Sequence, residues 1–314
     1  MAAQEKKILM IYNPRAGMTV RRPKAGEILR EFGSDAEKTD VMATAYPGHA
    51  GELAARFGKD YDIVVCCGGD GTLNEVVSGL RRADAAADVG YIPFGSTNDF
   101  ASNVGIPVKM PDAVRTVRTS EPRTCDVADF NDRSFTYIAS FGPGVSVSYS
   151  TPQHFKNVFG YSAYMINGFG FHMIPTLRAL KPKHIRVEYD GSVLEDDFYF
   201  GTVTNSLSAA GMFRYDKDEV RFNDGKFEVT LIRRMTSPMQ MFSLLQKMGR
   251  HEYDGETMLH FQASRLHFRF EKPEIWTLDG ESSGEITDAD IRVRHNALRL
   301  RCPDSVFFEK KDPA

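Results

Sequence analysis

Short apolar runs alternate with segments of helical period in the first third of the chain. The runs at residues 8–12 and 63–67 end at Asn13-Pro14 and at Gly68-Gly69, where turn-forming residues stop a buried strand. Further strands are expected at 41–45 and 90–93, and helices at 23–32, 51–57 and 73–81. Strands that alternate with helices of this length predict a parallel, doubly wound sheet with both faces covered.

The pattern changes after about residue 126, where apolar and polar residues often alternate with a period of two. Asp190-Gly191 lies between two such runs and predicts a tight hairpin. Strands are expected at 186–189, 198–204, 227–232, 266–270 and 276–278, and helices at 161–180 and 238–248. This part is therefore predicted to be mostly antiparallel β structure, and a chain of 314 residues favours two domains.

The amino-acid composition is that of a globular protein and argues against some classes of function. With 42% hydrophobic and 26% charged residues the chain is typical of globular proteins, and its net charge of -3 gives no basic footprint for nucleic acid. No signal peptide and no apolar run of about 18 residues is visible. The four cysteines show no metal-ligand spacing, which favours a reduced, cytoplasmic protein.

The most informative motif is an octapeptide between a strand and an amphipathic helix. It reads Gly68, Gly69, Asp70, Gly71, Thr72, Leu73, Asn74, Glu75. Glycines let the backbone approach a ligand, and free amides at the start of the next helix favour a phosphate. Asp70 would repel phosphate, so a place beside a metal ion suits it better. The alternative is a plain strand-to-helix turn with an Asp N-cap. The motif has neither Walker A nor dinucleotide-fingerprint spacing.

The octapeptide resembles the signature of the diacylglycerol kinase catalytic domain, shared with sphingosine, ceramide and bacterial lipid kinases. NAD kinases carry a shorter related form. Three further nucleotide-side segments match the family in order: the loop Asn13, Pro14, Arg15, Ala16, Gly17; then Thr44, followed by Pro47-Gly48-His49-Ala50; then the loop from Pro93 to Ala101, with Gly95, Ser96, Thr97 and Asn98. Ser96 stands where the family usually has Thr, so the hydroxyl is kept.

The resemblance also assigns the catalytic carboxylates. Asp279-Gly280-Glu281 matches the family's Asp-Gly-Glu, and Asp279 is expected to act as general base, with Glu281 as the alternative. A second copy, Asp254-Gly255-Glu256, lies earlier and fits the family's strand order less well. Asp70, Asp99 and Asp126 map to a water-linked carboxylate network near the catalytic Mg²⁺.

Two further assignments depend on the resemblance. The Asp224-Gly225 turn looks like the family's structural Mg²⁺ site, whose ligands would be Asp224 and the carbonyls of Arg221 and Lys226; the alternative is an ordinary hairpin turn. The aromatic stretch 155–171 is expected either to line an acyl-chain pocket or to be core. The segment 142–146 lacks the Asp of the family's glycine motif, so it leaves the substrate class open.

The resemblance implies an ATP-binding α/β domain at 1–126, completed by 302–314, and a β-sandwich lipid-substrate domain at 127–301. The expected reaction is transfer of the γ-phosphate of ATP, with Mg²⁺, to a lipid hydroxyl, with diacylglycerol giving phosphatidic acid. The alternatives are an NAD kinase-like enzyme and a catalytically silent nucleotide- or lipid-binding regulator. A lipid substrate implies transient contact with the inner face of the membrane, and family members often form homodimers.

Overall fold

The fold is described from a computed structural model. It describes residues 6–17, 23–33, 38–142, 181–209, 213–216, 218–237, 239–240, 243–244, 246–247, 252–304 and 307–308. The chain divides into two compact units. Unit 1 comprises Met1–Val127, Arg221–Asp224 and Arg294–Ala314, and unit 2 comprises Ala128–Val220 and Gly225–Val293. The sequence-based boundaries placed residues 221–224 and 294–301 in the second domain; both segments group with unit 1.

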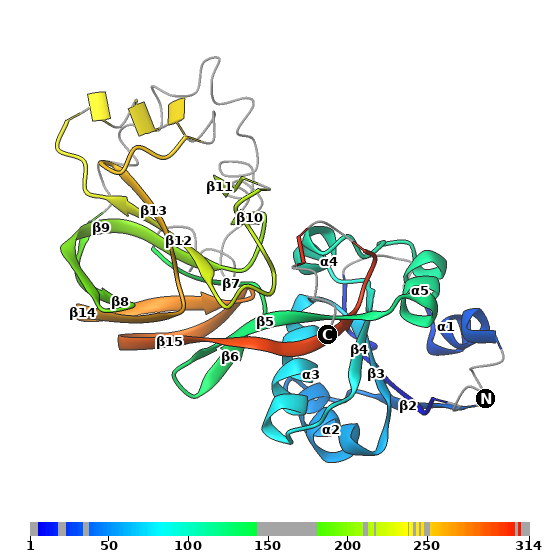
Figure 1. The fold of residues 1–314 in the computed structure, drawn as a ribbon. Helices are drawn as coiled ribbons and strands as arrows, with labels where there is room; N and C mark the ends of the chain where they lie inside the picture. The colour runs from blue at the N-terminus through cyan, green and yellow to red at the C-terminus, as the bar shows by residue number, and fades with distance from the viewer. Residues whose placement is uncertain are drawn as a thin grey trace. The chain divides into compact units, whose positions relative to one another are not determined.

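Unit 1 contains a parallel sheet (Figure 1). Its strands are β1 (Ile8–Tyr12), β2 (Thr39–Ala43), β3 (Ile63–Gly68) and β4 (Asp88–Pro93). β1 pairs in parallel with β2 and β3, and β3 pairs in parallel with β4. β15 (Glu281–Arg301) joins this sheet near its end, where Leu300 pairs with Val89. All six residues of β3 are buried, which explains its continuous apolar run.

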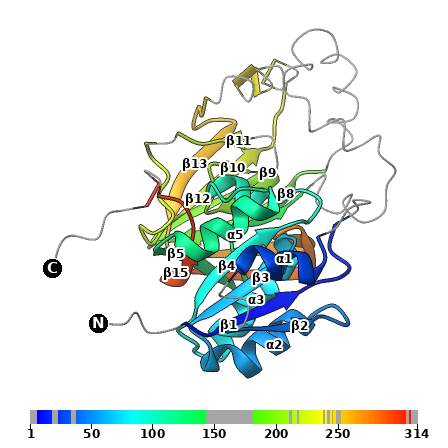
Figure 2. The same ribbon diagram turned by 90° about the vertical axis from the view of Figure 1, so that its right-hand side faces the viewer.

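Two pairs of helices accompany this sheet. α1 (Ala25–Phe32) packs with α5 (Met110–Thr119), and α2 (His49–Phe57) packs with α3 (Asp70–Arg82). Figure 2 shows α1 and α5 side by side over the strands. Apolar side chains of α1 and α5 share one buried cluster with residues of β1, β3 and β4. The remaining helices are the short α4 (Asp99–Asn103) and the 3₁₀ turn η2 (Gly58–Asp60). The sequence pattern did not predict α4 and α5.

Unit 2 is rich in antiparallel strands, as expected. They are β6 (Arg133–Phe135), β7 (Ile138–Phe141), β8 (Lys183–Tyr189), β9 (Ser192–Thr204), β12 (Phe227–Arg233), β13 (Met258–Ala263), β14 (Arg265–Leu278), the short pair β10 (Ser208–Ala209) and β11 (Phe213–Arg214), and parts of β5 (Pro122–Phe130) and β15. The neighbours run β13-β12-β9-β7-β14-β15, and β8 pairs with β9 and β14. Trp276 is fully buried among aromatic rings, including Phe130, Phe141 and Phe268. The sandwich form of this domain remains a prediction.

The strand predictions were confirmed in part. The hairpin at Asp190-Gly191 forms, with Tyr189 paired to Ser192. The separate strands expected at 266–270 and 276–278 were wrong, because both belong to β14, whose pairing with β15 shifts register between Arg269 and Glu274. The helix expected at 161–180 and the aromatic stretch 155–171 lie outside the described residues, as do five of the eleven residues of 238–248. No helix within the described ranges is long and apolar enough to cross a membrane.

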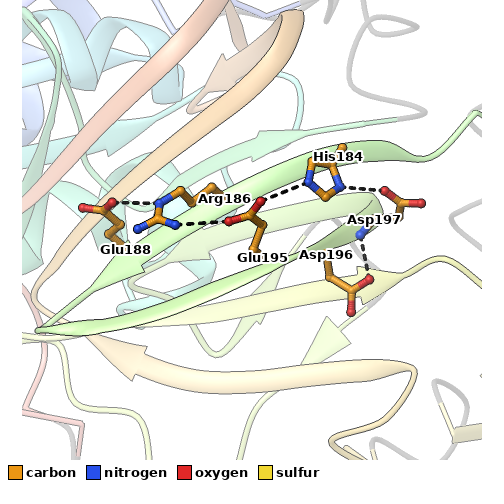
Figure 3. Close-up of polar contacts among 6 residues, drawn as sticks. All are labelled: His184, Arg186, Glu188, Glu195, Asp196 and Asp197. Atoms are coloured by element: carbon orange, nitrogen blue, oxygen red, sulfur yellow. Dashed lines mark hydrogen bonds and ion pairs between the residues drawn. The ribbon is translucent and has the colours of Figure 1, made fainter.

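The solvent-facing side of the β8–β9 hairpin carries a charged ladder (Figure 3). The His184 ring contacts Asp197 at 3.0 Å and Glu195 at 3.3 Å, and Arg186 contacts Glu195 at 3.1 Å. Hydrogen bonds to the two carboxylates raise the pKa of His184 above its ordinary value. These groups are exposed, so the ladder contributes little free energy of folding and serves mainly as a polar outer face.

Candidate active site

The octapeptide forms the turn from β3 into α3. Gly69 is the N-cap, with an extended backbone, and no side chain caps the helix. The start of a helix is a favourable place for an anion, because its first amides point away from the helix. Thr72 lies in this turn, and its hydroxyl accepts a hydrogen bond from the Asn13 side chain at 2.9 Å. That bond connects the loop after β1 to the turn from β3 into α3.

The backbone of the loop after β4 lies close to the backbone of the octapeptide. A Cβ added to Gly95 would lie 2.6 Å from the Cα of Gly69, which real structures do not tolerate. Asn98 fixes the loop by accepting a bond from the Gly95 amide at 2.7 Å and donating one to the Gly95 carbonyl at 3.2 Å. Asn98 has a left-handed backbone (φ 54°), a conformation that Asn adopts more readily than most residues. Gly69 and Gly95 therefore allow the octapeptide and the loop after β4 to approach each other closely.

Asp70 links the same two loops with its carboxylate. It is buried, and it accepts hydrogen bonds from the Tyr91 hydroxyl at 3.2 Å, the Thr97 hydroxyl at 3.4 Å and the Asp99 amide at 3.0 Å. Partial burial raises the pKa of the Asp99 carboxyl above its ordinary value, although its side chain still reaches solvent. Within the described part of the chain, no three His, Cys, Asp or Glu side chains form a group that could hold a metal ion. The contact between Asp70 and Asp99 is made by the Asp99 backbone amide.

The loop after β1 is an Asx turn. The Asn13 side chain accepts the Arg15 amide at 2.9 Å, while the Asn13 backbone donates to the Cys67 carbonyl at 2.9 Å. Gly17 follows with φ 74°, and Ala16 is buried. Thr44 extends the neighbouring strand, because its amide donates to the Tyr12 carbonyl at 2.9 Å.

The last three residues of the octapeptide build the surrounding structure. Leu73 is fully buried, so its side chain belongs to the core. The Glu75 carboxylate accepts the Gly48 amide at 2.8 Å and the Ala50 amide at 3.1 Å, and it thereby caps the N-terminus of α2. Asn74 accepts the Ser78 hydroxyl at 3.2 Å. These contacts explain the Asn-Glu pair by the packing of α2 against α3.

Asp126, the third carboxylate of the expected network, is buried. It lies inside β5, where it is 1% exposed. One carboxylate oxygen accepts the Asn296 amide at 2.7 Å and contacts the His295 ring at 3.1 Å. His295 and Asn296 lie 169 and 170 residues away along the chain, so sequence reasoning could not pair them with Asp126. Asn296, with φ 55°, marks the irregularity in β15 that turns its amide toward the carboxylate.

In unit 2, Asp279-Gly280 is the two-residue turn between β14 and β15. Both residues have positive φ, 48° and 87°, as a type I′ turn requires. The Asp279 carboxylate is buried and accepts four hydrogen bonds: from the Thr136 amide at 2.6 Å, the Thr136 hydroxyl at 2.7 Å and the Tyr137 and Ile138 amides at 3.0 Å each. Glu281 opens β15 and is exposed. The turn is therefore anchored by its Asp, while its Glu lies at the surface.

The second Asp-Gly-Glu copy has a similar construction. Asp254 accepts the amides of Glu256, Thr257 and Met258 and pairs with Lys247 at 2.6 Å. The Lys247 side chain and these donors outweigh the effect of burial and hold the pKa of Asp254 well below its ordinary value. Glu256 is exposed, as Glu281 is. An anchored Asp beside an exposed Glu is thus a property of both turns.

Comparison with known proteins decides the family. A model of the diacylglycerol kinase catalytic domain matches residues 7–130. A diacylglycerol kinase of Bacillus subtilis is 30% identical over 296 residues, which cover 92% of this chain and 95% of the relative. This chain belongs to the diacylglycerol kinase family. It is a lipid kinase, a phosphotransferase with an alcohol acceptor.

Other relatives agree over nearly the whole length. A diacylglycerol kinase of Staphylococcus aureus strain JH9 is 31% identical over 309 residues, covering 97% of this chain and 95% of the relative. The crystal structure of a diacylglycerol kinase from Bacillus anthracis strain Sterne matches with a TM-score of 0.70 at 19% identity, covering 95% of this chain and 97% of that one. That likeness supports the fold of a diacylglycerol kinase family member.

The structural Mg²⁺ site expected in this family member lies at the turn before β12. Gly225 has φ 80°, so the Asp224-Gly225 turn forms as the sequence suggested. The unit boundary falls between Asp224 and Gly225, so Arg221 and Asp224 belong to unit 1 and Lys226 to unit 2. Coordination of a metal ion by these three residues remains a prediction.

Proposed function

We propose that the chain is an ATP- and Mg²⁺-dependent lipid kinase that transfers the γ-phosphate of ATP to diacylglycerol, giving phosphatidic acid. The observation that carries this proposal is the Gly68-Gly69 turn into the start of α3, with Asp70 and the Gly95 loop fixed beside it. Phosphates would lie at Gly68–Thr72, where the helix amides attract negative charge. The loops Asn13–Gly17 and Gly95–Asn98 would flank them. The name diacylglycerol kinase, given to the relatives, supports the acceptor.

The donor set near Asp70 suits Mg²⁺ held together with a nucleotide. In phosphoryl transfer this ion is usually bound by one or two carboxylates and the substrate phosphates, and Asp70 and Asp99, whose amide donates to the Asp70 carboxylate, are the candidates here. When bound, Mg²⁺ would neutralise charge on the transferring phosphate. Asp126 is assigned to the water-linked part of this network by family resemblance, and His295 and Asn296 orient its carboxylate.

Glu281 is the better candidate for the general base. An ionised carboxylate offers about four lone-pair sites, and Asp279 already accepts four hydrogen bonds in a buried position. A base must reach the proton that it removes, and the exposed Glu281 can do so. The family resemblance led us to expect Asp279 as the base; we propose instead that Asp279 positions the turn that presents Glu281.

A substrate that resides in a bilayer requires the enzyme to visit the membrane surface. We therefore include transient peripheral contact with the membrane in the proposal. Sedimentation with diacylglycerol-containing vesicles checks it, and absence of the protein from the vesicle pellet would exclude this part.

The test of the function is transfer of radiolabelled γ-phosphate from ATP and Mg²⁺ into a panel of lipids in mixed micelles. The panel contains diacylglycerol, monoacylglycerol, phosphatidylglycerol and a sphingoid base, with NAD as a soluble acceptor. We expect labelled phosphatidic acid. Label in NAD alone would establish the soluble-substrate alternative. ATP binding in calorimetry without transfer to any acceptor would establish a silent regulator.

A further inference from the structure

The strand that begins with Glu281 contains a β-bulge directly after that residue. Trp276 of β14 pairs with Gly284 of β15, while the next residue of β14 pairs with Ser282, so Ser283 is an extra residue in β15. The Ser283 hydroxyl donates to the Trp276 carbonyl at 3.1 Å, and Gly284 has φ 84°. Bulges redirect the side chains near them and are frequent beside active sites. Glu281 therefore lies between an anchored turn and a bulge.

The side chain of Arg133 contacts this bulge. Arg133 is the first residue of β6, is exposed, and belongs to unit 2, as Glu281 does. Its Nη1 donates to the Ser282 carbonyl at 3.0 Å. Ser282 directly follows Glu281, and consecutive Cα atoms are about 3.8 Å apart, so the guanidinium is held close to the proposed base. Three residues after Arg133, the amide and hydroxyl of Thr136 bind the Asp279 carboxylate. One short segment of the chain thus holds both sides of the turn that presents Glu281.

Arg133 contacts no carboxylate in the part of the chain that the structure describes. Most other arginines of unit 2 do, namely Arg186, Arg233, Arg234, Arg265, Arg269 and Arg292. A guanidinium has five N–H donors, and the bond to Ser282 uses one of them. The planar fork of the remaining donors matches the oxygens of a phosphate. A tethered cation with donors to spare therefore lies at the surface beside the proposed base.

We propose that the Arg133 guanidinium binds the phosphoryl group during its transfer to the lipid. The acceptor oxygen that gives its proton to Glu281 forms the new bond to the γ-phosphorus, while the bond from that phosphorus to the leaving oxygen of ADP breaks. The phosphoryl oxygens therefore come close to the Glu281 carboxylate, which repels them. Arg133 offsets this repulsion and donates hydrogen bonds to the phosphoryl oxygens as the transfer proceeds. This inference rests on the proposed function, because it names a further catalytic residue for that reaction.

The test measures phosphate transfer from ATP to diacylglycerol in Arg133→Ala, Arg133→Gln and Arg133→Lys. Arg133→Ala should lower kcat by about 10²-fold and leave both KM values within about threefold of wild type, because the contact is made in the transition state. Arg133→Gln keeps an N–H donor for the Ser282 carbonyl but no charge, and should lose as much as Arg133→Ala. Arg133→Lys keeps the charge without the fork, and its loss should be about tenfold. Arg214→Ala is the matched control, because Arg214 is also an exposed arginine of unit 2 without a carboxylate partner among the described residues, and its kcat should not change.

Chemical rescue supplies a second readout. Methylguanidinium, added far below the concentration that unfolds the protein, should raise the kcat of Arg133→Ala and leave that of Arg214→Ala unchanged. An active wild type whose kcat falls less than about threefold in Arg133→Ala would overturn this inference alone. A wild-type kcat in Arg133→Gln would also overturn it, because the side chain would then act only as a tether for Ser282. A wild type without activity on any lipid would refute the proposed function, and this inference with it.

Discussion

Replacing Asp279 should destabilise unit 2 far more than a surface turn residue would. In Asp279→Ala the amides of Thr136, Tyr137 and Ile138 lose their acceptor inside the protein. Hydrogen bonds to a charged group contribute about 1.5–3 kcal/mol each, and local rearrangement with entry of water recovers part of the total. Ala at φ 48° adds about 1 kcal/mol of backbone strain. We expect the free energy of unfolding to fall by about 3–5 kcal/mol, and by about 1 kcal/mol less in Asp279→Gly.

The assay is urea unfolding followed by tryptophan fluorescence. Trp276 is the single tryptophan of the chain and is buried in unit 2, so its signal reports that unit. Asp190→Ala is the matched control, because Asp190-Gly191 is also a two-residue turn with positive φ at both positions, but Asp190 is exposed. Its loss should be about 1–2 kcal/mol. If Asp279→Ala cost no more than Asp190→Ala, the anchoring role of Asp279 would be refuted.

Two other perturbations probe each unit separately. Gly95→Ala would place a Cβ 2.6 Å from the Cα of Gly69, so the two loops should separate and the KM for ATP should rise about tenfold or more. Gly26→Ala is the control and should leave the KM for ATP unchanged, because an added Cβ there has nothing within 4 Å. Steady-state kinetics of both variants checks this. In unit 2, burial lowers the pKa of His260 to about 4 from 6.5, so the unfolded state binds more protons between these values and stability falls as pH drops through this window. The loss should be about 2 kcal/mol between about pH 7.5 and pH 5 by urea unfolding, and should disappear in His260→Gln; an equal loss in that variant would assign it to other groups.

The chain order of strands and helices from β1 to β4 could be predicted from the sequence because the local pattern determines it. A continuous apolar run such as residues 63–67 is typical of a buried parallel strand. The Asp-Gly turns are also local, and their glycines adopt positive φ values that other residues avoid. Each of these features therefore appears in the sequence where the structure has it.

The parts that sequence could not supply depend on contacts between distant residues. The donors to Asp279 lie 141–143 residues before it, and no pattern near either segment indicates the other. Polar residues such as Ser140, Thr202 and Thr230 lie side by side only because their strands pair in one register, which isolated threonines and serines do not reveal. Asp279 and Glu281 could not be ranked from sequence because their difference is burial and hydrogen bonding, which the fold alone decides.

The assignment of Glu281 is tested most directly by the kcat of phosphate transfer to diacylglycerol in Glu281→Gln, beside the matched variant Glu256→Gln. Both glutamates are exposed and follow an anchored Asp-Gly turn, so neither change should alter urea unfolding. We predict that Glu281→Gln lowers kcat by about 10²–10⁴ and that Glu256→Gln does not. A Glu281→Gln enzyme within about threefold of wild type, or an equal loss in both variants, would contradict the account.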